Sequence, residues 1–385
     1  MKVVNIGISL SIAVFVLLFV ESCGHNSTAI DDYNREIYVP RYASGFRILG
    51  RDTGENVLIE VFNPWQGADS VKTRLLIDRD ACGVPDGFDG QVLVGDAKRI
   101  VTLSSTHIAM LDAIGETDRV VGVSGMDFIT NPTIQAHRDR IGDIGYDGNI
   151  NVELLMALEP DIVLLYGVNG ASGIESKLRE LGIPYMYVGD YVEESPLGKA
   201  EWLVPLAELT GKRSEGLKVF SSIPVRYNHL KHKVDSCNYP LKPKVMLNIP
   251  YGDSWFMPSV NNYMVRLLTD AGAEYVYTEN KGNASRPVDM EEAYRLASGS
   301  DFWLNAGTVT TLSELNDVCP KFIDTPGFKN GNVYNNNARR NTAGGNDFFE
   351  SAIVHPEVVL HDLVSIFHPE LITDTIPLTY YHKLQ

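Results

Sequence analysis

The chain has 385 residues, of which 44% are hydrophobic and 21% charged, and its formal net charge at pH 7 is −16. This length allows two domains with separate cores, and the composition is that of an ordinary globular protein. So acidic a chain has little affinity for nucleic acid, because such binding depends on lysine and arginine contacts to phosphates. The negative charge serves solubility alone, or it steers the protein towards a basic partner surface.

Residues 1–22 are typical of a signal peptide, with a short positive start and an apolar run over 8–20. That run is shorter than the roughly 20 residues that span a bilayer. The small residue Ser22 directly before Cys23 resembles a bacterial lipoprotein cleavage site. We therefore expect Cys23 to carry a lipid and residues 23–40 to form a tether that holds the protein to a membrane in the periplasm. Secretion with an unmodified Cys23 is the alternative.

Residues 41–98 predict a β-rich extension packed on the lobe that follows. Apolar runs suggest strands at 46–49, 57–62 and 74–77, with turns over 50–56 and 64–67. An independent small domain is the alternative, but the segment is too short to carry much core alone.

The rest of the chain alternates between short apolar strands and helices, which predicts parallel sheets covered on both faces. The alternation occurs over 99–195 and again over 234–385, and we expect two Rossmann-like lobes of an α/β fold. Residues 196–233 predict a long, rigid helical connection with a break near Gly211 and a kink near Pro224. Such lobes form a cleft that closes little, which suits capture and delivery of a ligand better than catalysis.

The motifs of common hydrolases, nucleotide-binding enzymes and zinc proteases are missing from the sequence, and no His or Cys spacing is typical of a metal site. We expect no enzymatic activity, no cofactor and no metal held by the chain itself. A hydrolase that uses Ser105 with His107 is the alternative, although the two lie too close in sequence to form a relay easily. One disulfide is compatible with an oxidising compartment, but the sequence does not choose its pair. We treat the three remaining cysteines as structural: Cys82, Cys237 and Cys319.

In the first lobe, polar and aromatic side chains follow the predicted strands at their carboxyl ends, where ligands collect in open α/β sheets. Hydroxyl and backbone N–H groups at a helix start can hold polar ligand atoms, or the same residues serve only as a helix cap. The candidate ligand contacts are Ser105, Thr106, His107, Tyr146 and Tyr166.

In the second lobe, Trp255 and Phe256 lie in an expected loop after a strand, where they offer a flat apolar wall for a planar ligand or pack between the lobes. Arg339 and Arg340 follow another strand and suit an anionic chelate, with a solvated loop as the alternative. Phe348 belongs to a second aromatic cluster in this region and completes the candidate contacts.

Residues 99–368 resemble the class III periplasmic solute-binding proteins of ABC importers for ferric siderophores, haem and cobalamin. The most specific likeness is the run Asn151–Val163, which contains an N-x-E pattern followed by Ala-Leu-Glu-Pro-Asp. Further similar segments are 99–104, 201–212, 256–273 and 288–292.

The resemblance implies a monomeric extracytoplasmic lipoprotein that binds a siderophore-type iron chelate and delivers it to an ABC importer permease in the inner membrane. A corrinoid such as cobalamin, or haem with His107 or Tyr166 as axial ligand, is the alternative; a scaffold or sensor with an empty cleft is another. In this family one glutamate on each lobe docks into arginine pockets of the permease. The motifs match these residues to Glu153 and Glu291, for which helix capping is the structural alternative.

Overall fold

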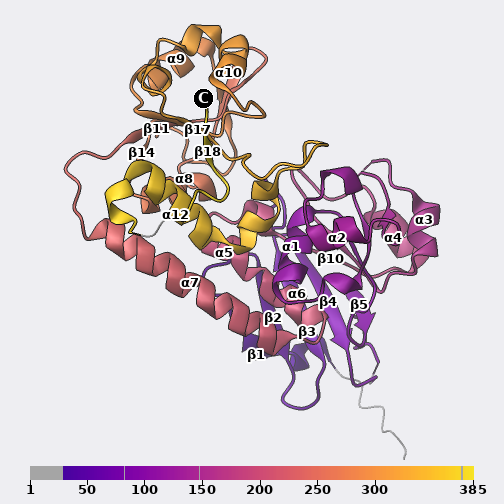
Figure 1. Ribbon diagram of the computed structural model, residues 1–385. Coiled ribbons are helices and arrows are strands. Elements are labelled where there is room, and N and C mark those ends of the chain that lie inside the picture. Colours follow the sequence, from indigo (N-terminus) through magenta and orange to yellow (C-terminus); the bar gives the residue numbers. More distant parts are fainter. Residues whose placement is uncertain (1–28, 82, 147, 374–375) are drawn as a thin grey trace, which may run out of the picture.

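The structure is a computed structural model that describes residues 29–81, 83–146, 148–373 and 376–385. An N-terminal β-sheet and an α/β lobe lie together on one side of the molecule, and a second α/β lobe lies on the other (Figure 1). The predicted architecture of two α/β lobes, a long connecting helix and a β-rich extension is confirmed. The expected signal peptide, Cys23 and Cys82 lie outside the described residues.

The N-terminal sheet has five strands in the order β1-β2-β3-β4-β5, antiparallel except for the parallel pair β4 and β5. The strands are β1 (Arg35–Tyr38), β2 (Phe46–Gly50), β3 (Val57–Phe62), β4 (Lys72–Asp78) and β5 (Gln91–Val94). β1 falls within the segment that we assigned to a tether, and this part of the assignment is wrong. Backbone pairing to β2 makes these four residues a strand, although only Ile37 and Tyr38 among them favour a strand and the first two are exposed.

Two buried carboxylates, Glu193 just before α5 (Pro196–Glu201) and Glu201 at its end, fasten the N-terminal sheet to the first lobe. Glu201 accepts a hydrogen bond from the hydroxyl of Tyr38 at 2.6 Å. It also accepts hydrogen bonds from the backbone N–H groups of residues 41, 42 and 43. Glu193 accepts hydrogen bonds from the backbone N–H groups of Ser44 and Gly45, each at 3.0 Å. Apolar side chains of the sheet also join the core of the lobe, so sheet and lobe form one packed unit: Phe46, Ile48, Val57, Ile59, Val61, Leu75 and Ile77.

The first lobe is built on a parallel sheet in the order β10-β9-β6-β7-β8. Its strands are β6 (Ile100–Thr102), β7 (Val120–Val123), β8 (Gly142–Asp143), β9 (Ile162–Leu165) and β10 (Tyr185–Tyr187), and its helices are α1 (Ser105–Ala113), α2 (Pro132–Ala136), α3 (Val152–Ala157) and α4 (Glu175–Leu181). Every residue of β6, β9 and β10 is buried, because helices and the N-terminal sheet cover the central strands.

Three helices connect the lobes: α5 (Pro196–Glu201), α6 (Leu203–Leu209) and α7 (Arg213–Asp235). The expected break is present at Gly211, which separates α6 from α7 with a positive φ of 72° that glycine adopts readily. Pro224 lies inside α7, and the helix continues through it. α7 is bound to the second lobe by a 2.6 Å ion pair between Arg226 and Glu357.

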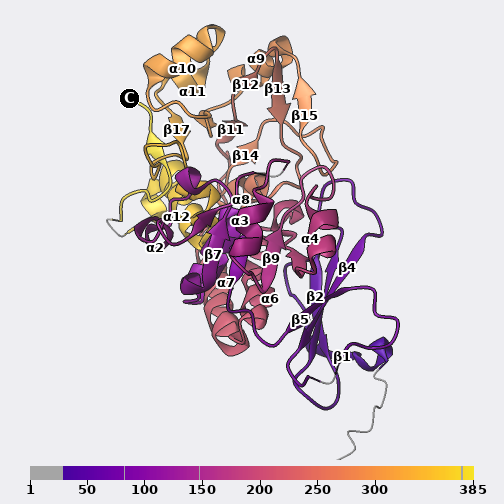
Figure 2. The same ribbon diagram turned by 90° about the vertical axis from the view of Figure 1, so that its right-hand side faces the viewer.

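The second lobe repeats the theme with the order β14-β11-β16-β17-β18, parallel except for the last pair. Its strands are β11 (Lys244–Leu247), β14 (Glu274–Tyr275), β16 (Phe302–Leu304), β17 (Val333–Asn335) and β18 (His382–Lys383), and its helices are α8 (Tyr263–Asp270), α9 (Met290–Ser298), α10 (Leu312–Val318), α11 (Pro326–Lys329) and α12 (Pro356–Phe367). Figure 2 shows a separate small sheet beside α9, at the end of this lobe far from the N-terminal sheet. It consists of β12 (Pro250–Tyr251), β13 (Ser254–Met257) and β15 (Arg286–Val288).

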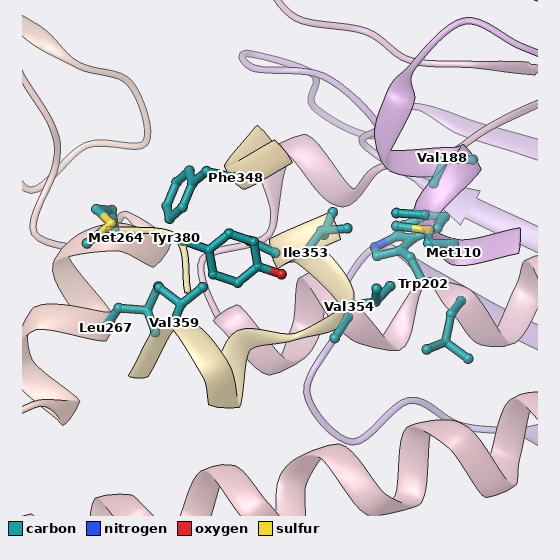
Figure 3. Packing of buried hydrophobic residues seen from close by; sticks show 14 of the residues in the cluster. Met110, Val188, Trp202, Met264, Leu267, Phe348, Ile353, Val354, Val359 and Tyr380 are labelled. Atoms are coloured by element: carbon teal, nitrogen blue, oxygen red, sulfur yellow. The ribbon is translucent and has the colours of Figure 1, made fainter. Parts of the chain in front are cut away.

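An apolar core runs without interruption from one lobe to the other. Figure 3 shows Met264 and Leu267 of α8 on one side, Met110 of α1 and Trp202 on the other, and Ile353 between them. Ile353 belongs to a short 3-10 segment, Ser351–Val354, that packs on α1 and leads into α12. This continuous packing opposes large relative movement of the lobes, because close-packed interiors deform little.

Within the described part of the chain, no helix is both long and apolar enough to cross a membrane. Cys237 is exposed and Cys319 buried, and both are free thiols. Burial raises the pKa of Cys319 to about 11, which makes this thiol unreactive at neutral pH.

Candidate ligand-binding cleft

A cleft of about 930 Å³ lies between the lobes. The first lobe contributes residues that follow strand ends, such as Thr106 after β6 and Tyr166 after β9, as ligand sites in open α/β sheets generally do. The second lobe contributes the start of α8, with Asn262 and Tyr263, and the segment around Phe348. The volume falls within the range of about 300–1,000 Å³ that is usual for small-molecule sites.

Aromatic side chains form a large part of the apolar lining and come from the N-terminal sheet and from both lobes. Tyr191 and Phe349 remain 44% and 59% exposed, so part of each ring is accessible to a ligand in the cleft. The complete aromatic set is Tyr42, Phe62, Trp65, Tyr166, Tyr191, Tyr263, Phe348 and Phe349. Rings in this arrangement offer flat contact surfaces to a large ligand.

Four charged residues in the described part of the chain line the cleft, and two of them, Lys199 and Asp190, bind each other. Glu193 is buried and accepts a hydrogen bond from the indole of Trp202, whereas Glu194 is exposed. Lys199 on α5 donates a hydrogen bond to the backbone carbonyl of Asp190, and its ammonium lies 4.0 Å from the carboxylate of the same residue. Burial lowers the pKa of Lys199 and raises that of Asp190, and each charge partly offsets the shift of the other. Lys199 is the only cationic side chain in the lining among the described residues, and the remaining polar groups are mainly amides and hydroxyls.

A smaller cavity of about 460 Å³ continues the cleft at the strand ends of the second lobe. It shares Tyr263, Phe348 and two further residues with the main cleft, so the two hollows adjoin. Asparagines predominate among its polar residues: Asn248, Asn262, Asn305, Asn336, Asn337 and Asn346.

Comparison with known proteins agrees with this geometry. A model of a periplasmic binding protein family matches residues 100–337. The chain belongs to this family. It is 23% identical over 355 residues to an uncharacterised lipoprotein of Methanocaldococcus jannaschii, and the alignment covers 86% of this chain and 82% of that protein. It is 26% identical over 275 residues to the vitamin B12-binding protein of Vibrio campbellii, and the alignment covers 61% of this chain and 92% of that protein.

Solved structures are similar in fold. A periplasmic haem-binding protein from Pseudomonas aeruginosa superposes with a TM-score of 0.59 at 16% identity, over 75% of this chain and 98% of that one. This periplasmic binding protein therefore shares its fold with a haem-binding member of the class, and the predicted resemblance to periplasmic solute-binding proteins is confirmed.

Of the residues just after β6 that we predicted as ligand contacts, only one lines the cleft. Thr106 lines the cleft of the binding protein, and so does Ser104, which caps α1; Ser105 does not. His107 is fully buried on α1, and neither ring nitrogen has a hydrogen-bond partner among the described residues, so its prediction as a ligand contact or haem ligand is wrong. None of the hydrogen bonds in the described residues joins Ser105 to His107, and the alternative of a Ser–His hydrolase has no support.

The aromatic wall expected in the second lobe is not there. Trp255 has no exposed surface: its indole N–H donates to the carbonyl of Leu247 at 2.8 Å and its ring packs against Phe322. Phe256 points to the other face of the small sheet and is 43% exposed away from the cleft. The expected loop is strand β13, whose alternation turns Trp255 inward and Phe256 outward.

The two arginines also differ from expectation. Arg339 lies outside both cavities, where it forms an ion pair with Asp347 at 3.0 Å. Arg340 lines only the smaller cavity and donates to the carbonyl of Thr308 at 2.9 Å. Their loop crosses to the first lobe, where the side-chain amide of Asn341 donates to backbone carbonyls at 2.9 and 3.2 Å. The loop thus joins the lobes instead of presenting a cationic site in the main cleft.

The remaining predicted residues are placed as follows. Tyr166 and Phe348 line the main cleft, whereas Tyr146 is 54% exposed and packs its edge on Phe128 outside it. Glu153 and Glu291 are exposed in the first turns of α3 and α9, where the helix dipole favours a carboxylate.

Sequence reasoning missed the cleft residues from the N-terminal sheet and from α5. Trp65 stood in a run that we read only as a turn, Pro64 to Gly67, although a tryptophan beside turn residues is itself a signal of a binding surface. Lys199 gave no signal, because it becomes part of the cleft only through tertiary packing.

Proposed function

We propose that this protein captures a bulky metal chelate outside the cytoplasm and delivers it to the permease of an ABC importer. The cleft of about 930 Å³ between the lobes, lined by aromatic rings from both, is the observation that carries the proposal. Planar or large apolar ligands gain most from such a surface, because each ring contributes a large contact area at a small entropic cost. The continuous core between the lobes supports a binding mode with little closure.

Within this class, the lining favours a ligand of low net charge. The only cation of the main cleft within the described residues, Lys199, already faces Asp190. Glu193 and Glu194 add negative charge that disfavours an anionic ligand. The other polar groups are hydroxyls and amides in the main cleft and mainly amides in the smaller cavity. An uncharged ferric hydroxamate suits this lining better than an anionic catecholate or haem, whose carboxylates would need cationic partners. A corrinoid, whose rim carries amides, is the second candidate, and the relationship to a vitamin B12-binding protein supports it.

Delivery would use the two exposed glutamates. Glu153 on the first lobe and Glu291 on the second stand free at helix starts, ready to meet arginine pockets of a permease. Asp289 caps α9 and Glu292 binds Arg295, so other residues already serve the structural roles around Glu291. A lipid on Cys23 would keep the protein at the membrane near its importer, and the lipoprotein names of relatives support this.

A ligand screen tests the proposal. The purified full-length chain is titrated with ferrichrome as the ferric trihydroxamate, with cyanocobalamin and with hemin, and binding is followed by calorimetry. We expect one of the two weakly charged probes to bind with a micromolar or tighter Kd, at least tenfold more tightly than hemin. Binding of none of the three would contradict the proposed ligand class, and preference for hemin would contradict the argument from charge.

A further inference from the structure

We infer that the N-terminal β-sheet is part of the ligand site: the β3–β4 loop, residues 63–71, forms a third wall of the cleft that contacts uncharged parts of the ligand. The inference rests on the proposed function and adds a specificity-determining element to it. The matched family region begins at residue 100, so this wall belongs to a part of the chain outside that region.

Eight residues from the N-terminal sheet and its loops line the main cleft, and they come from two segments. The first segment enters β2 and the second leaves β3, so both lie at the same end of the sheet. The residues are Tyr42, Ser44, Gly45, Phe62, Asn63, Trp65, Gln66 and Ala68.

Specific contacts fix the β3–β4 loop against the first lobe at the ends of β9 and β10. The ring of Trp65 packs edge-on against Tyr187, with 5.2 Å between ring centroids. The backbone N–H of Gln66 donates to the carbonyl of Val168 at 2.9 Å. Gly167 leaves room for the approach, because a Cβ there would lie 2.9 Å from the Cβ of Trp65. The loop is therefore preorganised, which reduces the entropic cost of binding a ligand.

The chemistry of this wall is apolar and amide-like. Trp65 remains partly exposed, and the side-chain amide of Gln66 has no hydrogen-bond partner among the described residues. The second lobe also lines the cleft with the exposed, uncharged Asn283 and Ser285. No acidic or basic side chain stands among the eight lining residues of the N-terminal sheet. The wall therefore suits the apolar face and amide or hydroxyl groups of a ligand, and it offers no cationic side chain to a carboxylate.

A matched pair of substitutions separates this role from that of a structural cover. Ala68 lines the cleft and is partly buried, whereas its neighbour Asp69 is exposed and does not line it. Ala68→Trp adds a large side chain to the cleft without removing any contact, and Asp69→Trp adds the same side chain outside it. We expect Ala68→Trp to weaken binding of the best of the three probes at least tenfold and Asp69→Trp to change it less than twofold. Equal affinities of the two variants, with unchanged unfolding midpoints, would overturn the inference.

Tryptophan fluorescence provides a second readout. The chain has four tryptophans, and Trp202, Trp255 and Trp303 are at most 1% exposed. Quenching by acrylamide therefore reports mainly on Trp65. A bound probe should protect the wild type from acrylamide and leave the residual quenching of Trp65→Phe unchanged. Undiminished quenching of the wild type at saturating probe would contradict contact with this wall.

The inference remains testable if none of the three probes binds and the proposed ligand class fails. The aromatic dye 1-anilinonaphthalene-8-sulfonate enters apolar clefts without being a specific ligand. If the β3–β4 loop lines the cleft, Ala68→Trp lowers the dye fluorescence at least twofold and Asp69→Trp does not. Equal dye binding by both variants would then overturn the third wall independently of the natural ligand.

Discussion

The ammonium group of Lys199 on α5 lies over the ring of Tyr263 at the start of α8, 4.7 Å from the ring centroid. The same group donates a hydrogen bond to the backbone carbonyl of Asp190, so it links the first lobe, the connecting region and the second lobe. Burial raises the pKa of Tyr263 to about 12, and the phenol therefore stays neutral beside the lysine at physiological pH. Lys199 therefore holds three parts of the cleft wall together, and it is also the only cationic side chain of the lining among the described residues.

Replacing Lys199 by methionine should destabilise the protein by about 3–5 kcal/mol, because the carboxylate of Asp190 then stays buried without its partner. Urea unfolding monitored by circular dichroism measures the loss. Lys177→Met is the control, since its pair with Glu180 is exposed and worth at most about 1 kcal/mol. Adding Asp190→Asn to Lys199→Met should recover much of the loss. Equal stability of Lys199→Met and wild type would show that the contact between Lys199 and Asp190 does not stabilise the packing of the lobes.

His107 should make the stability depend on pH in a defined direction. Burial lowers its pKa to about 3, below the value of about 6.5 expected in the unfolded chain. The contribution is therefore fully present above about pH 6.5 and is lost as the pH falls towards 3, because only the unfolded state binds the proton there. One such group changes the free energy of unfolding by at most about 1.4 kcal/mol per pH unit.

His107→Leu tests this dependence. The leucine removes the titrating group together with two ring nitrogens that have no partner among the described residues, so we expect unchanged or greater stability at pH 8. Between pH 4 and 6.5 the variant should show a shallower loss of stability than the wild type in urea unfolding. Parallel pH profiles of the two proteins would mean that His107 is solvated or hydrogen-bonded in solution.

Glu201→Gln should loosen the segment that leads into the N-terminal sheet. The buried carboxylate accepts hydrogen bonds from successive backbone N–H groups of Arg41, Tyr42 and Ala43, and a single amide oxygen cannot satisfy them all. We expect a loss of at least about 2 kcal/mol and faster hydrogen exchange at residues 41–43. Glu215→Gln, an exposed change on α7, is the control and should do neither. Unchanged exchange in Glu201→Gln would contradict this anchoring role.

Local sequence pattern was sufficient for most of the fold. The uninterrupted aliphatic run Ile162–Leu165 indicates a buried strand, and the alternation of such runs with helices over 99–195 and 234–385 predicted the two lobes. β1 escaped prediction because only two of its four residues, Ile37 and Tyr38, favour a strand, and too short a run gives no clear alternation. A regular spacing of apolar residues arises where one face of a strand is buried, and an edge strand such as β1 buries few side chains.

The site was much less predictable, because a cleft combines segments that have no relation in the sequence. Trp255 and Trp65 both appeared beside turn residues, yet one is fully buried and only the other lines the cleft. The alternation of Trp255 with Met257, both buried, marks a strand and was the available clue. Lys199 carried no clue, since helix position alone does not reveal what packs opposite it.

Changing Glu153 and Glu291 together to alanine should reduce uptake by cells with the matching importer at least tenfold while leaving the Kd for the ligand unchanged. The reason is that both carboxylates are exposed and lie outside the cleft, so their loss removes charges available to the permease and no ligand contact. The control pair Asp139→Ala and Glu274→Ala removes the same charge from exposed sites on the same two lobes and should leave uptake within twofold of the wild type. Equal uptake by the two double variants would place the permease contact elsewhere on the surface, whereas a weaker Kd in the glutamate pair would mean that these helices communicate with the ligand site.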